Sequence, residues 1–194
     1  MRDLPNLLER VIMAEVSGAV FVVDDDPSMR AALGDLISSI GLQARLFASP
    51  QEFLQSNPPD ILGCLVLDVR LPGMSGLTFQ SKLARAGIAF PVIFITGHGD
   101  IPMSVRAMKA GAVEFLTKPF HDQDLLDAIH TALERDRERR RGAAIAVQLR
   151  ERYATLTERE RQIMGLVVIG RANKQIAAEL SLSEIGRASC RERV

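Results

Sequence analysis

The sequence lacks the features that mark secreted and membrane proteins. Its 194 residues include two cysteines, Cys64 in an apolar run and Cys190 in a polar tail, which make neither a disulfide framework nor a metal-binding spacing. No apolar run approaches the roughly 20 residues that a membrane helix needs. The opening segment MRDLPNLLERVIMAEVSG interrupts its apolar positions with acidic residues, unlike a secretory signal. We therefore expect a cytoplasmic protein with no membrane partner, in which Cys64 is a core residue.

Charge is balanced over the whole chain but not along it. Residues 1–137 contain 17 acidic and 12 basic side chains, whereas residues 138–194 contain 7 and 12. This asymmetry indicates two modules, the second facing a polyanion. A solvated helix face around ERDRERRRG explains the basic cluster equally well, so charge alone leaves both interpretations open.

Short apolar runs alternate with helical segments over the first module. Continuous apolarity is typical of strands buried on both faces, and the runs are residues 19–23, 44–47, 61–67, 91–95 and 112–116. Capping residues open the intervening segments: Asp26 before Pro27, Ser49 before Pro50, and Asp100. The pattern predicts an α/β fold, a five-stranded parallel sheet doubly wound by helices on both faces. A last helix from residue 122, with Leu125, Leu126, Ile129 and Leu133 on one stripe, is expected to run out into a charged linker.

Ligands of a doubly wound sheet bind beyond the carboxyl ends of its strands. The polar residues at those positions are Asp24, Asp25, Asp26, Asp68, Thr96 and Lys118. An oxygen-rich set without paired His or Cys suits a hard divalent cation such as Mg²⁺. The cation and Lys118 would compensate the adjacent carboxylates, while Asp26 leaves the cluster to cap the first helix.

Four motifs in register resemble the receiver domain of two-component response regulators. They are VVDDDPSMR, LVLDVRLPGMSG, FITGHGD and EFLTKPF, each at a strand end. The resemblance implies a flavodoxin-like sheet of order 2-1-3-4-5. It also implies a cis bond between Lys118 and Pro119.

The resemblance further implies the roles of the site residues. Asp68 would be the phosphoacceptor, and Mg²⁺ would be bound by Asp25, Asp68 and the backbone carbonyl of Arg70, with Asp24 helping directly or through water. Lys118 would pair with the phosphoryl oxygens, and the Thr96 hydroxyl would donate to one of them.

Phe115 matches the aromatic switch position of this family. Together with Thr96 it would couple phosphorylation to the face made by the fourth helix, the fifth strand and the fifth helix. A plain core aromatic is an equally good interpretation of Phe115.

The second module reads LTERERQIMGLVVIGRANKQIAAELSLS over residues 156–183. Thr157 and Glu160 form a capping box, and Asn173 is expected to cap a second short helix. The stretch is similar to the LuxR-type helix-turn-helix, which makes the whole chain resemble response regulators of the FixJ type. Asn173 and Lys174 are expected to make weak contacts to the DNA backbone. The alternative is a helical hairpin used for dimerisation.

The similarity to the LuxR-type domain stops after Ser183. Residues 184–194, EIGRASCRERV, can be back-translated into DNA that resembles a sequencing adapter, so we expect a non-native tail. Without a recognition helix the chain as written is not expected to bind a specific promoter. A divergent native helix, with Arg187, Arg191 and Arg193 on phosphates, is the alternative. Met13 is a second candidate start.

These features predict a domain order and a function. The domains are an N-terminal extension (1–17), a receiver (18–137), a helical charged linker (138–155), a partial helix-turn-helix (156–183) and the tail (184–194). The predicted function is a phosphorelay response regulator that is phosphorylated on Asp68 by a sensor histidine kinase and regulates transcription through a C-terminal DNA-binding domain. Promoter DNA is the expected partner of the full-length protein, and a phosphorylation-dependent homodimer is a further expectation. We expect no enzyme beyond assisted phosphotransfer and slow autodephosphorylation.

Two alternatives remain open. One is a stand-alone receiver that acts by protein contact. The other is an Mg²⁺-dependent phosphatase with an Asp nucleophile, a family that resembles the site but requires a second Asp where this chain has Arg70.

Overall fold

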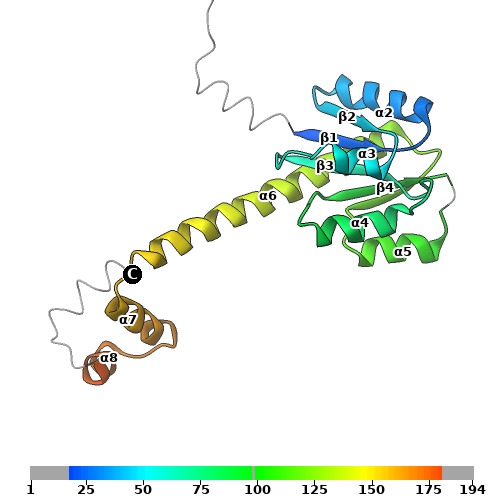
Figure 1. Ribbon diagram of the computed structural model, residues 1–194. Coiled ribbons are helices and arrows are strands. Elements are labelled where there is room, and N and C mark those ends of the chain that lie inside the picture. The colour runs from blue at the N-terminus through cyan, green and yellow to red at the C-terminus, as the bar shows by residue number, and fades with distance from the viewer. Residues whose placement is uncertain (1–17, 98, 181–194) are drawn as a thin grey trace, which may run out of the picture. The chain divides into compact units, whose positions relative to one another are not determined.

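The computed structural model describes residues 18–97 and 99–180 (Figure 1). Five parallel strands form one sheet in the order β2-β1-β3-β4-β5. The strands are β1 (Ala19–Val23), β2 (Gln43–Phe47), β3 (Gly63–Asp68), β4 (Val92–Thr96) and β5 (Glu114–Thr117). The predicted α/β class and the predicted strand order are both confirmed.

Two strand ends differ from the prediction in a way that matters for the site. Asp68 and Thr96 are the last residues of β3 and β4, rather than the residues that follow them. Main-chain pairing includes both residues, because the Val69 N–H, directly after Asp68, donates to the Ile95 carbonyl at 3.0 Å and the Thr96 carbonyl accepts from the Lys118 N–H at 2.8 Å. Both side chains therefore start from regular sheet backbone.

Helices cover both faces of the sheet. α3 (Pro50–Gln55), α4 (Gly76–Arg85) and α5 (Ile101–Lys109) pack on one face, and α2 (Pro27–Ser39) with the first part of α6 (Asp122–Ala154) packs on the other. Successive strand residues point to opposite faces, so Phe21 joins the first core layer and Val20 the second. Asp26, Ser49 and Asp100 cap α2, α3 and α5 as predicted.

The chain divides into two compact units after Arg140, and α6 carries that boundary. Leu125, Ile129 and Leu133 are buried as expected, with Leu126 partly buried. The charged run beyond them is not wholly solvated, however. Asp136 is completely buried, which the expectation of a solvated helix face missed.

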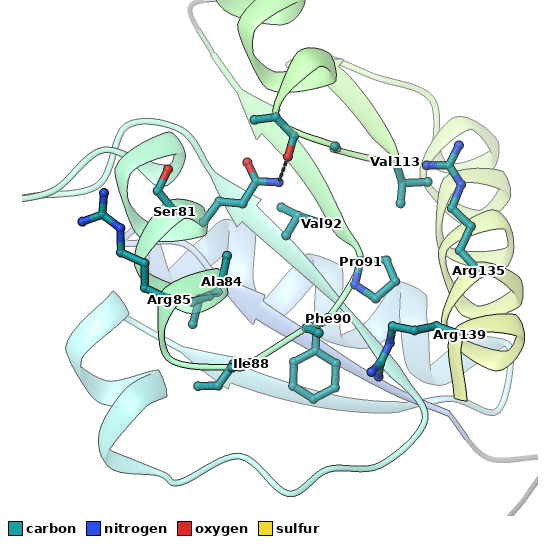
Figure 2. Close-up of a pocket in the computed structure, with 16 residues that line it drawn as sticks. Ser81, Ala84, Arg85, Ile88, Phe90, Pro91, Val92, Val113, Arg135 and Arg139 are labelled. Carbon is teal, nitrogen blue, oxygen red and sulfur yellow. Dashed lines mark hydrogen bonds between the residues drawn. The ribbon is translucent and has the colours of Figure 1, made fainter. Parts of the chain in front are cut away.

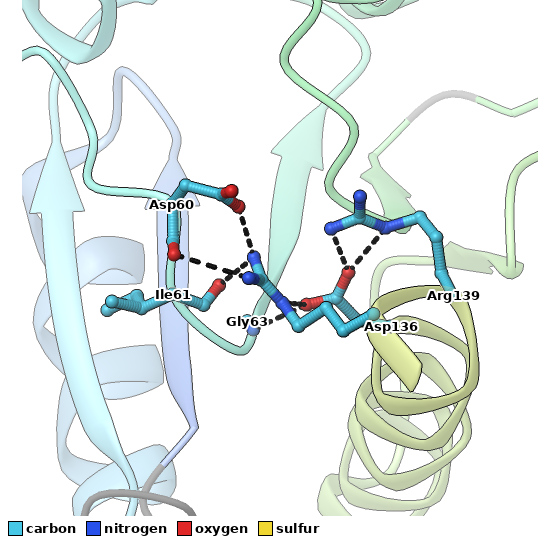
Figure 3. A network of polar contacts seen from close by, with 6 residues as sticks. Asp60, Ile61, Gly63, Asp136 and Arg139 are labelled. Carbon is cyan, nitrogen blue, oxygen red and sulfur yellow. Dashed lines mark hydrogen bonds and ion pairs between the residues drawn. The ribbon is translucent and has the colours of Figure 1, made fainter. Parts of the chain in front are cut away.

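Asp136 anchors α6 to the start of β3 (Figure 3). Its carboxylate accepts hydrogen bonds from the Gly63 N–H at 3.1 Å, from two nitrogens of Arg139 and from Nε of Arg140 at 2.8 Å. Arg140 also donates to the Asp60 carboxylate at 2.5 Å and to the Ile61 carbonyl at 2.6 Å. The buried carboxylate is thus compensated by two guanidinium groups of its own helix.

The second unit contains α7 (Glu158–Val168) and α8 (Asn173–Leu180). The capping box of Thr157 and Glu160 is present, and Ile163 and Ile176 are buried. α8 begins at Asn173, so Ala172 rather than Asn173 occupies the cap position, which corrects the prediction by one residue. The reason is that the Ala172 carbonyl accepts the first helical bond, from the Ile176 N–H, while the Gln175 side chain accepts from the Ala172 N–H.

The predicted N-terminal extension and the predicted tail lie outside the described residues. Among the helices of residues 18–97 and 99–180, none combines the length and the apolarity required to cross a membrane.

Candidate functional site

Three carboxylates meet at the carboxyl edge of the sheet. Val23 of β1 is in register with Leu67 of β3, so Asp24 and Asp68 are the next residues along adjacent strands. One oxygen from each of Asp24, Asp25 and Asp68 lies within 4.8 Å of the others. Asp24 and Asp68 are buried, whereas Asp25 is exposed. The structure therefore brings the predicted carboxylate ligands together.

Asp26 leaves this cluster, as predicted. Its Oδ1 accepts hydrogen bonds from the Ser28 and Met29 N–H groups and so caps α2. The Asp26 N–H in turn donates to Asp24 Oδ1 at 2.8 Å. The Asp26 carboxylate thus caps α2, and it is not one of the carboxylates that meet in the cluster.

Lys118 reaches the cluster from the loop after β5. Its ammonium lies 2.7 Å from Asp24 Oδ2 and 2.8 Å from Asp68 Oδ2. The Lys118–Pro119 bond is cis, as the family resemblance implied. Lys118 is the cation that the sequence required beside buried carboxylates.

Burial and ion pairing shift the pKa values of this pair. Burial raises the pKa of Asp68, and hydrogen bonds from Lys118 and from the Arg70 N–H only partly offset that rise. Burial on its own would lower the pKa of Lys118, but hydrogen bonds to the Asp24 and Asp68 carboxylates outweigh it and raise the pKa above its usual value. Lys118 is consequently a permanent positive charge at neutral pH.

The remaining predicted residues surround Asp68. Arg70 follows β3, and its backbone N–H donates to Asp68 Oδ1 at 2.8 Å. Thr96 is buried at the end of β4, one residue beyond Ile95, which pairs with Asp68. At the start of α4, Gly76 approaches the Asp68 backbone so closely that a Cβ there would lie 2.5 Å from the Asp68 carbonyl oxygen. A side chain at position 76 would therefore displace the Asp68 backbone.

Phe115 is half-buried against the first core layer, with its ring centroid 6.5 Å from that of Phe94. Gly99 lies close to it, because a Cβ on Gly99 would lie 2.9 Å from the Phe115 ring. This placement is compatible with both of its interpretations, a core aromatic and a switch residue.

Arg30 is a member of the site that the sequence analysis did not identify. From the first turn of α2 its guanidinium donates to the Asp24 carbonyl at 2.6 Å. The sequence spacing of Arg30 could have indicated this position. A residue four positions after the helix cap, as Arg30 is after Asp26, lies one helical turn further on and on the same face of the helix.

The donor set fits a hard divalent cation. All candidate ligand atoms are carboxylate or carbonyl oxygens, which Mg²⁺ prefers. Both oxygens of Asp24 already accept hydrogen bonds, whereas within residues 18–97 and 99–180 the Asp25 carboxylate accepts none. Asp68, like Asp24, accepts a hydrogen bond at each oxygen, from the Arg70 N–H and from Lys118, so among the described residues Asp25 is the carboxylate of this cluster whose oxygens are not already engaged.

Two other features lie away from this site. A groove of about 720 Å³ at the amino ends of the strands is bordered by Ile88, Phe90, Arg135 and Arg139 (Figure 2), on the edge opposite Asp68. In the second unit, Asn173 and Lys174 are exposed in the first turn of α8.

A parallel sheet of order 2-1-3-4-5 with clustered aspartates and a paired lysine at its carboxyl edge defines a receiver domain. Residues 20–130 match the model of the response regulator receiver domain, and residues 154–186 match that of bacterial regulatory proteins of the luxR family. The chain therefore belongs to the two-component response regulators that carry a LuxR-type DNA-binding domain. Neither family is an enzyme family.

Individual relatives support the same family assignment. The chain is 57% identical over 172 residues to Nodulation protein W of Bradyrhizobium diazoefficiens, covering 89% of this chain and 76% of that protein. It is similar in structure to response regulator StyR, with a TM-score of 0.77, 47% identity and coverage of 91% and 89% of the two chains. Full-length FixJ from B. japonicum gives a TM-score of 0.59 at 39% identity and the same coverage. The predicted FixJ-type membership is confirmed.

The two families carry general implications for partners. A receiver domain implies a histidine kinase as partner and typically binds Mg²⁺, and a LuxR-type domain implies DNA.

Proposed function

We propose that Asp68 accepts a phosphoryl group from a phosphohistidine of a sensor kinase. One Oδ of Asp68 attacks phosphorus, the P–O bond forms as the P–N bond breaks, and the imidazole leaves. The observation that carries this proposal is the ion pair of Lys118 with Asp68 at a carboxylate-rich strand edge. Lys118 offsets the repulsion between the negatively charged Asp68 carboxylate and the negatively charged phosphoryl group that it attacks.

We assign Mg²⁺ to Asp25, Asp68 and the backbone carbonyl of Arg70. Asp24, whose two oxygens accept from the Asp26 N–H and from Lys118, would assist directly or through water. When bound, the metal supplies charge neutralisation between the carboxylates and the phosphoryl oxygens. The Arg70 N–H holds Asp68 Oδ1, which leaves the orientation of the attacking carboxylate largely set by the backbone.

The proposed switch consists of Thr96 and Phe115. In the phosphorylated protein the Thr96 hydroxyl donates to a phosphoryl oxygen, while Lys118 pairs with another. Since Gly99, three positions after Thr96, lies close to the Phe115 ring, a movement of Thr96 that carries Gly99 with it would change the space available to that ring. Phosphorylation replaces the single negative charge of the Asp68 carboxylate with a phosphoryl group of about −1.5 to −2 charges, and its three acceptor oxygens can bias such a local equilibrium.

The output surface we propose is the exposed side of α5. Ile101, Val105 and Met108 follow one another at helical spacing and are 80%, 45% and 45% exposed. Burying this apolar stripe against a second copy would give a phosphorylation-dependent homodimer. In the full-length protein the dimer would act on promoter DNA in the cytoplasm, with Asn173 and Lys174 making weak contacts to the DNA backbone. Slow autodephosphorylation would return the protein to its resting state.

The phosphorylation proposal is tested by intact mass after incubation with MgCl₂ and acetyl phosphate. We expect a gain of about 80 Da, one phosphoryl group, that disappears in Asp68→Ala and in EDTA. Asp35→Asn, an exposed carboxylate on α2, is the matched control and should gain the same mass. A gain that persists in Asp68→Ala would assign the acceptor elsewhere, and no gain in the wild type would overturn the proposal.

A further inference from the structure

Arg30 is held in place by the same segment that carries the acidic residues. Asp26 caps α2, and the Arg30 N–H donates to the Asp26 carbonyl at 3.0 Å in the first turn. From there the guanidinium returns to the Asp24 carbonyl at 2.6 Å. Arg30 is half-buried, and the contact is charge-assisted, so it is stronger than an ordinary surface hydrogen bond.

This contact holds the peptide unit between Asp24 and Asp25. A peptide bond is planar, so fixing the Asp24 carbonyl also fixes the direction of the Asp25 N–H and the start of the Asp25 residue. Three further hydrogen bonds restrain Asp24. Its N–H donates to the Phe47 carbonyl, and its carboxylate accepts from the Asp26 N–H and from Lys118. Within the described residues no hydrogen bond restrains the Asp25 carboxylate, so its orientation depends on the backbone that Arg30 holds.

We propose that Arg30 is a positioning residue for Asp25, which fixes the Asp24–Asp25 peptide so that the Asp25 carboxylate faces the divalent cation. The proposal rests on the proposed function of the carboxylate cluster. Arg30 acts through Asp25 and is not itself a metal ligand, because a guanidinium has no acceptor atom.

Positioning and simple charge have opposite effects on cation binding, which makes the role of Arg30 testable. A guanidinium beside the cluster repels Mg²⁺, so if charge alone mattered, removing Arg30 would tighten Mg²⁺ binding. If Arg30 positions Asp25, removing it weakens binding, since groups that orient metal ligands typically contribute about 10- to 100-fold in affinity.

The experiment follows the thermal midpoint of the full chain against MgCl₂ concentration at constant ionic strength. Far-UV circular dichroism is the probe, because the chain has no tryptophan. The variants are Arg30→Met and Arg30→Gln. Arg30→Gln retains an N–H donor, and it keeps the test possible if Arg30→Met does not fold. Arg85→Met removes an exposed charge on α4 and is the control. We expect about tenfold weaker Mg²⁺ binding in Arg30→Met, a smaller loss in Arg30→Gln and none in Arg85→Met.

A second readout separates binding from chemistry. In Arg30→Met the MgCl₂ concentration for half-maximal phosphorylation by acetyl phosphate should rise, while the rate at saturating MgCl₂ falls much less. In an Asp25→Asn background, Arg30→Met should have little further effect, because the two residues act as one unit.

The outcomes are distinguishable. If the wild type neither responds to MgCl₂ nor gains a phosphoryl group, the proposed function is wrong and this proposal fails with it. If the wild type does both and the Arg30 variants bind Mg²⁺ equally or more tightly, only the positioning role is overturned.

Discussion

The ammonium of Lys118 lies 2.8 Å from Oδ2 of Asp68, across 50 positions of sequence. The same ammonium contacts Asp24, which is completely buried. One cation thus offsets two carboxylates at the carboxyl edge of the sheet, so it supports the stability of the resting fold as well as the chemistry proposed for Asp68.

We expect Lys118→Met to destabilise the metal-free protein by about 3–5 kcal/mol, because it leaves a buried carboxylate without its partner. Urea unfolding in EDTA measures this. Added MgCl₂ should recover more stability in the variant than in the wild type, since a divalent cation can replace part of the missing charge. Lys82→Met, at an exposed position of α4, is the control and should change stability by less than about 0.5 kcal/mol. Equal stability of the two variants would show that the ion pair does not offset the burial of Asp24.

The raised pKa of Asp68 gives a pH dependence of known sign. The folded state holds this proton more tightly than the unfolded state, whose Asp pKa is about 3.9. The contribution of protonated Asp68 to the free energy of unfolding is therefore complete below about pH 3.9, and it is lost as the pH rises through the pKa of Asp68 in the native state. In EDTA, Asp68→Asn should therefore gain stability relative to the wild type between about pH 4 and pH 7. Urea midpoints at several pH values test this, with Asp35→Asn as the control; parallel curves would contradict it.

Burial, together with the nearby Asp136 carboxylate, raises the pKa of the Cys64 thiol far above its usual value. The thiol ionises in the unfolded chain near pH 8.5 but stays protonated in the native protein. Stability should therefore fall above that pH by up to about 1.4 kcal/mol per pH unit from this group alone. Cys64→Ala should show a shallower alkaline decline of the urea midpoint between about pH 8 and pH 10, whatever its stability at pH 7. Identical slopes in both proteins would refute the assignment.

Removing the anion or the cations of the Asp136 network should have unequal effects. Arg139 and Arg140 are partly exposed, so in Asp136→Asn they return to water and the loss should be about 2–3 kcal/mol. The double variant Arg139→Met/Arg140→Met leaves the completely buried Asp136 carboxylate without a cation. It should lower the free energy of unfolding by more, about 3–5 kcal/mol. Urea unfolding compares them, with Arg137→Met, half of an exposed ion pair, as a control near zero. A larger loss in Asp136→Asn would reverse this interpretation.

Local patterns were sufficient to predict the α/β class of the first unit, whereas its strand order was implied by the family resemblance. Apolar runs identified all five strands, and the Asp26 and Ser49 caps were predicted correctly because capping depends on residues within one helical turn. The edge that gathers Asp24, Asp68 and Lys118 was also predictable, since parallel strands place their carboxyl ends together.

Other features depend on groups that are distant in sequence. In the sequence Asp136 belongs to a run of alternating charges, and only the Gly63 N–H, 73 positions away, together with the neighbouring guanidinium groups, makes its burial possible. Arg30 is close in sequence to the acidic cluster, yet its role depends on the angle at which α2 leaves the sheet.

Periodicity, capping and strand direction predicted from the sequence alone which segments form strands and helices and which carboxylates share an edge, because these properties are local. The family was recognised from the resemblance of whole motifs and is shown by the matches to the family models. The burial of Asp136 and the absence of hydrogen bonds to the Asp25 carboxylate among the described residues became apparent from the folded structure. Burial and hydrogen-bond saturation depend on the packing of segments that are far apart in the chain, and no local pattern encodes that packing.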